Sequence, residues 1–366
     1  MSHSTAQMQA ASKRRARRVT INDLADSLGL AKGTVSRALN GYPDIAETTR
    51  ARVARAAERM GYRPMAQAQA IRTGRARSLG LVLNTGNADL HRPFLTDFLD
   101  GISRAASEET WTLTVATANG TEDEVTSMER LVDERKVDGF ILPRAMYNDP
   151  RVALCRDRGV PFILYGRTGD PEDCAWFDIA GEDAMQSAVR LFAAAGHRRI
   201  GFINGARKYT FAHLRYDAFV AGMAEAGLAV TPETIAEGVL DIAAGESAGA
   251  RILRADPGLT AVVCAMDLAA LGLYRAAERL GRRVGRDLAV ISYDGLPQAE
   301  IADPPLTTFA VDNRAAGQRL ARLLIARIRG ADPVHLRELA PARLIERASH
   351  LIEVSPAAAG PPTDFA

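Results

Sequence analysis

Residues 19–41 read VTINDLADSLGLAKGTVSRALNG, and this stretch decides how the first part of the chain folds. Apolar residues at helical spacing predict a first helix, whose cap is supplied by Asn22 or Thr20. Gly29 accepts the left-handed backbone that a corner between two helices needs. A second helix is predicted over about residues 32–39. The stretch therefore indicates a helix-turn-helix.

The outer face of the second predicted helix carries residues that can reach base edges or phosphates in a DNA major groove. They are Lys32, Gly33, Thr34, Ser36, Arg37 and Asn40. Because Gly33 has no side chain, Lys32 and Arg37 are expected to carry most of the direct base readout. A third helix is predicted over residues 46–60, and the three together would form a small all-α headpiece.

The longer run over residues 19–64 closely resembles the DNA-binding headpiece of the LacI/GalR family of bacterial transcription regulators. Its T-V-S-R-x-L-N-G core, the following E-x-T-R and the G-Y-x-P ending stand at the family's spacing. The alternative is a three-helix bundle with no DNA function, which is disfavoured because so long a motif rarely matches by chance. Thr20 and Tyr62 are further candidate DNA contacts. The headpiece is placed at residues 19–62.

Two positions depart from the family's pattern. The family usually has Ser or Thr before its second and third helices, where this chain has Ala31 and Ala46. Alanine cannot accept a capping bond or contact phosphate through a hydroxyl. Asp44 is expected to offset the loss at the third helix.

Residues 63–77, RPMAQAQAIRTGRAR, are interpreted as a hinge helix and linker. A helix this short is marginal alone. The resemblance implies that it folds when two subunits meet on an operator, and that an apolar side chain then enters the minor groove. Ile71 occupies that position, and Ala68 is a second candidate contact. The alternative is a flexible linker.

Charge is distributed unevenly along the 366 residues. Residues 1–77 contain 15 Lys and Arg against 5 Asp and Glu, whereas the remainder contains 31 against 39. A basic end on an acidic body is typical of a polyanion-binding module joined to a domain that does not bind DNA. Residues 1–18 are expected to be a disordered basic arm, attracted to phosphates without sequence preference.

No pattern in the sequence indicates a metal site, a cofactor or a membrane span. Three cysteines lack metal-ligand spacing and are expected to be buried apolar residues. Neither a signal peptide nor a bilayer-long apolar run is found, so a cytoplasmic protein is expected. Catalytic motifs such as a phosphate loop or a nucleophile elbow are also absent from the sequence.

From Ser78 onward, short apolar strands alternate with amphipathic helices, which predicts parallel sheets covered on both faces. The pattern restarts near Asp183, so two doubly wound lobes are expected. The resemblance extends through V-D-G-F-I-L, A-G-H-R-R-I-G-F-I and P-P-L-T-T. It implies the periplasmic-binding-protein fold over residues 78–353. The expected boundaries are about 78–178 and 309–340 for lobe 1, about 179–308 and 341–353 for lobe 2, and 354–366 for a flexible tail.

Polar residues at the carboxyl ends of parallel strands should surround a cleft between the lobes. The candidate effector contacts are Asn84, Arg167, Phe177, Phe211, Arg215, Met266, Asp267 and Asp294. The resemblance implies that Arg215 and Asp294 bind the effector, and an arginine with carboxylates suits hydroxyl groups. Turn and core roles remain the alternatives for each candidate. Gly166 stands where the family often has Asp, so another member's specificity is not copied here.

The sequence thus predicts a transcription regulator, most simply a repressor, that binds a near-palindromic DNA operator as a homodimer. A small-molecule effector, expected to be a sugar, would bind in the cleft and change operator affinity. The rival hypotheses are a solute-binding protein and a sugar-processing enzyme fused to a DNA-binding unit. The proline- and glycine-containing tail precludes a C-terminal coiled coil, so a dimer rather than a tetramer is expected.

Overall fold

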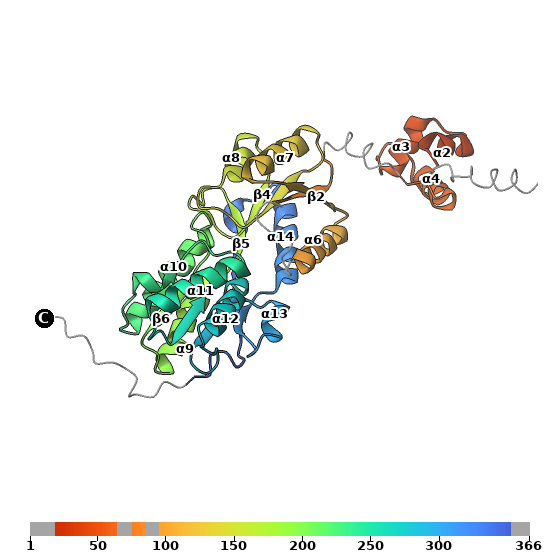
Figure 1. The fold of residues 1–366 in the computed structure, drawn as a ribbon. Coiled ribbons are helices and arrows are strands. Elements are labelled where there is room, and N and C mark those ends of the chain that lie inside the picture. The colour runs from red at the N-terminus through yellow and green to blue at the C-terminus, as the bar shows by residue number, and fades with distance from the viewer. Residues whose placement is uncertain (1–18, 64–74, 85–94, 353–366) are drawn as a thin grey trace, which may run out of the picture. The chain divides into compact units, whose positions relative to one another are not determined.

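The structure is a computed structural model that describes residues 19–63, 75–84 and 95–352 of the chain (Figure 1). The chain divides into two compact units, Met1–Ala76 and Arg77–Ala366.

The described part of the first unit, residues 19–63, is a bundle of three helices that we call the headpiece. α2 (Ile21–Leu28) begins at Thr20, whose Oγ1 accepts a hydrogen bond from the Asp23 backbone N–H at 3.3 Å. The Asp23 carboxylate in turn accepts one from Thr20 N at 2.8 Å. α3 (Lys32–Leu39) and α4 (Glu47–Met60) follow. The predicted helix-turn-helix is confirmed, with Thr20 rather than Asn22 as the cap.

One apolar side chain from each helix is fully buried at the centre of the headpiece. Leu24, Val35 and Val53 are each 0% exposed. Neither α3 nor α4 has a side-chain cap, as expected from the alanines that precede them. The expectation that Asp44 would offset the loss at α4 is wrong, because its carboxylate pairs with Arg37.

Lobe 1 of the second unit is built on a six-stranded parallel sheet with the order β11-β5-β4-β3-β1-β2. The strands are β1 (Ser78–Asn84), β2 (Thr112–Ala118), β3 (Gly139–Pro143), β4 (Phe162–Tyr165), β5 (Ala175–Ile179) and β11 (Arg337–Ala340). The helices are α6 (Leu95–Glu108), α7 (Thr121–Asp133), α8 (Pro150–Asp157) and α14 (Asn313–Ile328). Leu81 packs in one cluster with residues of α6 and α14, and its neighbour Val82 packs in another with residues of α7 and α8. The helices therefore cover both faces of the sheet.

Lobe 2 repeats this plan with the order β12-β10-β9-β8-β6-β7. The strands are β6 (Ile200–Ile203), β7 (Ile235–Ala236), β8 (Ala261–Cys264), β9 (Ala289–Asp294), β10 (Thr307–Ala310) and β12 (Arg343–Ile345). The helices are α9 (Gly181–Ala194), α10 (Thr210–Glu225), α11 (Ile242–Ala255), α12 (Asp267–Arg279) and the short α13 (Pro297–Glu300). Single-turn 3₁₀ helices occur at Pro232–Thr234 and Pro333–His335. Only β12 in this sheet is antiparallel to its neighbour, β10.

The chain crosses between the two sheets three times: after β5, between β10 and α14, and between β11 and β12. The predicted fold class, a helical headpiece with two doubly wound lobes, is confirmed. Three strands were not predicted, namely β5, β11 and β12.

Candidate nucleic-acid interface and interlobe cleft

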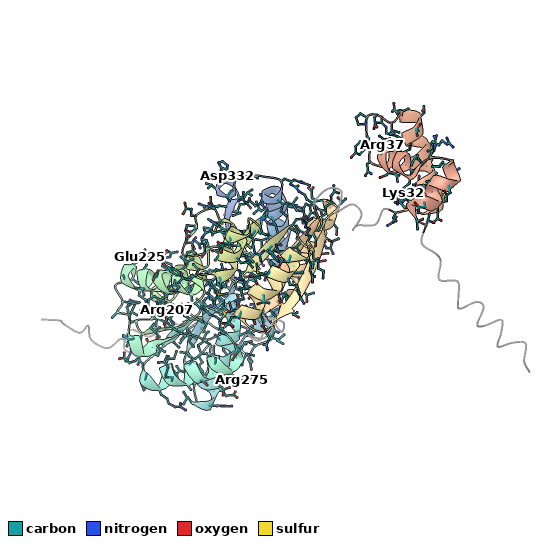
Figure 2. The ribbon with its side chains drawn as sticks, turned by 90° about the horizontal axis from the view of Figure 1, so that it is seen from above. Lys32, Arg37, Arg207, Glu225, Arg275 and Asp332 are labelled. Carbon is teal, nitrogen blue, oxygen red and sulfur yellow. The ribbon has the colours of Figure 1, made fainter. Side chains whose placement is uncertain are left out.

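The outward face of α3 presents the predicted base-reading residues. Lys32, Gly33 and Arg37 are exposed, while Thr34, Ser36 and Asn40 are half-buried. Figure 2 labels Lys32 and Arg37 on the headpiece. A Cβ added at Gly33 would meet nothing within 4 Å, so this position leaves open space on the helix. Asn40 Nδ2 donates to Ser36 O at 2.6 Å, which occupies one of its two donors.

The remaining predicted DNA contacts, Thr20, Tyr62, Ala68 and Ile71, do not belong to α3. Thr20 is exposed, but its hydroxyl donates to the Asp23 carboxylate at 2.7 Å. Tyr62 packs against the headpiece core, and burial raises the pKa of its hydroxyl. Ala68 and Ile71 lie outside the described residues, so their roles stay predictions.

A cleft that is partly open to solvent lies between the lobes of the second unit. Both lobes contribute to its lining, since Arg167 follows β4 and Arg215 lies on α10. The structure brings five predicted residues together here, and they are Arg167, Phe211, Arg215, Met266 and Asp294. The sequence did not predict Arg144, Tyr165, Asp178, Glu182, Tyr293 and Asn313, which also line the cleft.

Arg215 is held in the cleft by its neighbours. Its Nη1 donates to Ala265 O at 2.6 Å, and its Cζ lies 4.8 Å from the Phe211 ring centroid and 3.9 Å from that of Tyr293. Within the described residues, its Nε is buried without a hydrogen-bond partner. A Cβ at Gly181 would lie 2.7 Å from this Nε, so the glycine leaves room for the guanidinium. Arg215 is therefore fixed in place while retaining donors for a ligand.

Phe211 supports Arg215 and also stacks on Tyr209, at 5.5 Å between centroids and 12° between planes. These contacts show a supporting role for the ring. Its expected stacking on a sugar remains a prediction.

The Arg167 guanidinium donates hydrogen bonds to two carboxylates from different elements. Its Nε donates to Asp178 on β5 at 2.7 Å, and its Nη2 donates to Glu182 on α9 at 2.6 Å. Burial raises the pKa of Asp178, although the Arg167 charge favours the ionised carboxylate. Asp178 and Glu182 flank the first crossing between the lobes, so Arg167 bridges that crossing.

Asp294 ends β9 with a φ of 130°, and Gly295 follows with a φ of 75°. A positive φ is costly for a residue with a side chain, and such strain needs support from the surroundings. Part of that support comes from Asp267. Its Oδ2 accepts a hydrogen bond from Leu296 N at 2.7 Å, and its Oδ1 accepts one from Thr308 Oγ1 at 2.7 Å and another from Ser292 Oγ.

This arrangement corrects the prediction for Asp267. The residue is 0% exposed and does not line the cleft, because its carboxylate is buried against Ser292, Leu296 and Thr308. Burial raises the pKa of this carboxyl, while the hydrogen bonds favour its ionised form. Asp267 is therefore a structural residue that holds the turn after Asp294.

Phe177 and Asn84 also lie outside the lining of the main cleft. Phe177 is 8% exposed and packs against Tyr165, with 6.3 Å between ring centroids, so the expected effector contact is replaced by a core contact. Asn84 lines an adjoining small pocket, and its Oδ1 accepts a hydrogen bond from Gly120 N at 3.2 Å. Pro143 and Arg144 line both cavities.

A backbone connection joins the lobes beside the cleft. Met146 and Tyr209 form an antiparallel bridge, flanked by hydrogen bonds from Tyr147 N to Lys208 O at 2.9 Å and from Thr210 N to Ala145 O at 3.2 Å. Arg144 lies over the Tyr209 ring at 4.5 Å. The lobes are thus in direct contact at this edge.

Residues 19–63, 75–84 and 95–352 contain no group of three His, Cys, Asp or Glu placed to hold a metal ion. Cys155, Cys174 and Cys264 are buried and unpaired in disulfides. No helix in the same ranges has the length and apolar character needed to cross a bilayer.

A helix-turn-helix in one unit and, in the other, a cleft between two lobes that is lined by both charged and apolar residues define a DNA-binding regulator with a ligand-binding type of core. Residues 20–65 match the family described as bacterial regulatory proteins, lacI family, and residues 189–350 match the periplasmic binding protein-like domain. The HTH-type transcriptional regulator AglR of Rhizobium meliloti (strain 1021) is 36% identical over 90% of this chain and 94% of its own length. CelR of Thermobifida fusca is 32% identical over 88% and 96%.

Solved structures agree with this classification. The CelR–cellobiose complex matches with a TM-score of 0.71 at 30% identity, covering 91% of this chain and all of that one. The Lac repressor dimer bound to operator and an anti-inducer has the same fold, with a TM-score of 0.77 at 24% identity over 92% of this chain and 100% of that chain. The chain therefore belongs to the LacI family of bacterial regulatory proteins and is a helix-turn-helix transcriptional regulator.

Proposed function

We propose that this regulator represses transcription as a homodimer on a near-palindromic operator, and that a neutral sugar in the interlobe cleft changes its operator affinity. A dimer places two recognition helices about one DNA turn apart, so a two-fold protein recognises a site with two-fold symmetry. The basic outer face of α3 supports the DNA-binding half of the proposal.

The observation that carries the effector assignment is the balance of charge in the cleft. Three arginines, Arg144, Arg167 and Arg215, line it together with three carboxylates, Asp178, Glu182 and Asp294. An anionic ligand would need an excess of arginines, and a cationic one an excess of carboxylates. Equal numbers of arginines, which donate, and carboxylates, which accept, suit a neutral molecule with many hydroxyl groups. The cellobiose in the CelR structure is a neutral sugar and supports the same class.

The proposed switch couples the cleft to the hinge over residues 63–77. A ligand that bonds both lobes would favour one angle between them, and in a dimer this would change the separation of the two hinges. A hinge helix of this length would be too short to be stable alone, so a change in separation would shift its folding and the insertion of Ile71. Moving most of the population from bound to released requires several kcal/mol of differential affinity.

A two-stage experiment tests the proposal. Thermal shift with a panel of neutral mono- and disaccharides, with sugar phosphates as the anionic contrast, should give stabilisation by one or a few neutral sugars. Gel shift on a site selected from random duplex DNA should then show that the same sugars change operator affinity. Stabilisation by sugar phosphates alone would overturn the neutral-sugar assignment, and selection of no sequence would overturn specific DNA binding.

We further propose that the protein has no catalytic role and acts in the cytoplasm, where the chromosome lies. The named relatives are regulators, which supports this reading. Incubation with each stabilising sugar, followed by chromatography, should return the sugar unchanged. Turnover of any of them would favour the fused-enzyme alternative.

A further inference from the structure

The turn after α3 brings an acidic residue back beside the recognition helix. Gly41 takes a φ of 71°, and Tyr42 N donates to Arg37 O at 3.1 Å. Ile45 N donates to Tyr42 O at 3.2 Å, and the Ile45 side chain is 8% exposed in the headpiece core. Arg50 Nη1 also donates to Tyr42 O at 3.2 Å. The turn over residues 40–45 is therefore held at several points.

Asp44 lies in this turn and pairs with Arg37. Its Oδ2 accepts a hydrogen bond from Arg37 Nη1 at 2.7 Å, and both side chains are 51% exposed. The two residues are seven apart and not on one helix, so the turn rather than helical spacing brings them together. Arg37 is one of the two residues on α3 expected to read bases.

The atoms used in this pair matter for base reading. Asp44 engages Nη1, which leaves the edge of the guanidinium formed by Nε and Nη2. A guanine presents O6 and N7 in the major groove, and arginine reads them with two donors at once. A carboxylate that fixes the guanidinium from its other edge reduces the conformations that must be lost on binding.

A solvated surface pair is the simpler interpretation, since exposed pairs stabilise a fold little. However, a carboxylate beside the recognition helix lies close to DNA phosphates and therefore weakens binding to every sequence. That cost is offset where Asp44 improves the bond to one base. Such a residue raises the ratio of specific to non-specific affinity in two ways, because it strengthens one base contact and weakens binding to other DNA.

We propose that Asp44 is a positioning residue for base readout: it holds Arg37 so that the Nε–Nη2 edge bonds a guanine in each half-site, and its charge lowers affinity for other DNA. The proposal rests on the sequence-specific DNA binding proposed above. Asp44 itself touches no base in this scheme.

The test compares base preference with non-specific binding in the full-length protein. The parent is used to select an operator from random duplex DNA, and Arg37→Ala identifies the guanine whose preference depends on Arg37. Asp44→Ala should then reduce the preference for that guanine about three- to tenfold, while affinity for DNA lacking the operator rises. The slope of log K against log salt should steepen by about two for the dimer, as expected for one more unpaired cation in each subunit.

A double-mutant cycle decides whether Asp44 acts through Arg37. In the Arg37→Ala background, Asp44→Ala should cause no further loss of base preference. Asp44→Asn keeps an oxygen acceptor without the charge and should retain part of the preference. Glu58→Ala, which removes an exposed carboxylate from α4, is the matched control and should leave base preference unchanged.

The outcomes separate the two proposals. If the parent selects no sequence, specific DNA binding itself is wrong. If the parent selects an operator but Asp44→Ala keeps the full preference, or loses it equally with and without Arg37, the positioning role is overturned. Helix content is checked by circular dichroism, and should Asp44→Ala prove unfolded, an unchanged preference in Asp44→Asn overturns the role instead.

Discussion

Replacing Arg215 with alanine should separate effector binding from DNA binding. The guanidinium lines the cleft, packs over the rings of Phe211 and Tyr293, and donates to Ala265 O at 2.6 Å. Truncation removes every donor that this side chain offers to a ligand. The headpiece belongs to the other compact unit, so its DNA-reading surface should be unaffected.

The size of the effect follows from the contacts that Arg215 can make. A hydrogen bond to a charged group contributes about 1.5–3 kcal/mol, so losing one to the effector should weaken its binding about 10- to 150-fold. The protein also loses the Ala265 bond and two cation–π contacts, which are worth about 0.5–2 kcal/mol each. The free variant should therefore melt lower, by about 2–4 °C for each kcal/mol lost.

Two assays distinguish these effects. Titration calorimetry with the sugar identified in the thermal-shift panel measures effector affinity, and gel shift on the selected operator measures DNA affinity with and without that sugar. Without sugar, Arg215→Ala should bind operator within about twofold of the parent, as expected for sites with no shared contacts. At the concentration that saturates the parent, the sugar should leave DNA binding by the variant unchanged.

Arg275→Ala is the matched control, because Arg275 is an exposed arginine on α12 (Figure 2). It should respond to the sugar as the parent does. Arg215→Lys keeps the charge without the planar fork and should show an intermediate affinity. A response of Arg215→Ala at the parent's half-maximal sugar concentration would refute the reasoning.

The hinge, the assembly and one buried histidine allow further tests. Ile71→Ala should weaken specific operator binding without changing effector affinity in the DNA-free protein; operator binding as tight as the parent's would contradict the wedge role. Sedimentation at micromolar concentration should show a dimer, and a stable tetramer would be the opposite result. Burial lowers the pKa of His197 below its ordinary 6.5, so the unfolded chain binds more protons than the folded one below about that pH. The melting temperature of the core should therefore fall as pH drops through about 6.5, and His197→Gln should flatten this dependence; parallel curves for the two proteins would show that His197 does not contribute.

Most of the fold could be predicted because its signals are local. The helix-turn-helix is set by a cap at Thr20, a left-handed Gly29 and apolar residues at helical spacing. The alternation of buried strands with amphipathic helices likewise predicted two doubly wound lobes. β11 and β12 were missed because they are short and half-exposed, and because their partners are distant in sequence, as when β11 pairs with β5.

The cleft was only partly predictable, because side-chain direction depends on tertiary contacts. The expectation that residues at the carboxyl ends of parallel strands line the cleft was correct for Arg167, Met266 and Asp294. It could not show that the Asp267 side chain is buried away from the cleft. Nor could it predict that Arg167 would be occupied by Asp178 and Glu182, which come from an unpredicted strand and the helix after it. Buried and half-buried residues alternate in AWFDI, and its aromatic and apolar residues were the signal that the sequence offered for that strand.

The buried Asp267 has a consequence for altering what this regulator responds to. Its carboxylate ties β9, β10 and the turn after Asp294 together without touching the cleft. Other residues that line the cleft, such as Met266 and Val311, can therefore be exchanged in a library while the backbone that positions Asp294 stays fixed. Gly166 is a poor choice for such a library, because its φ of 109° strains any residue with a Cβ. Engineering of new ligand responses would therefore vary these lining residues and leave Asp267, Ser292 and Thr308 intact.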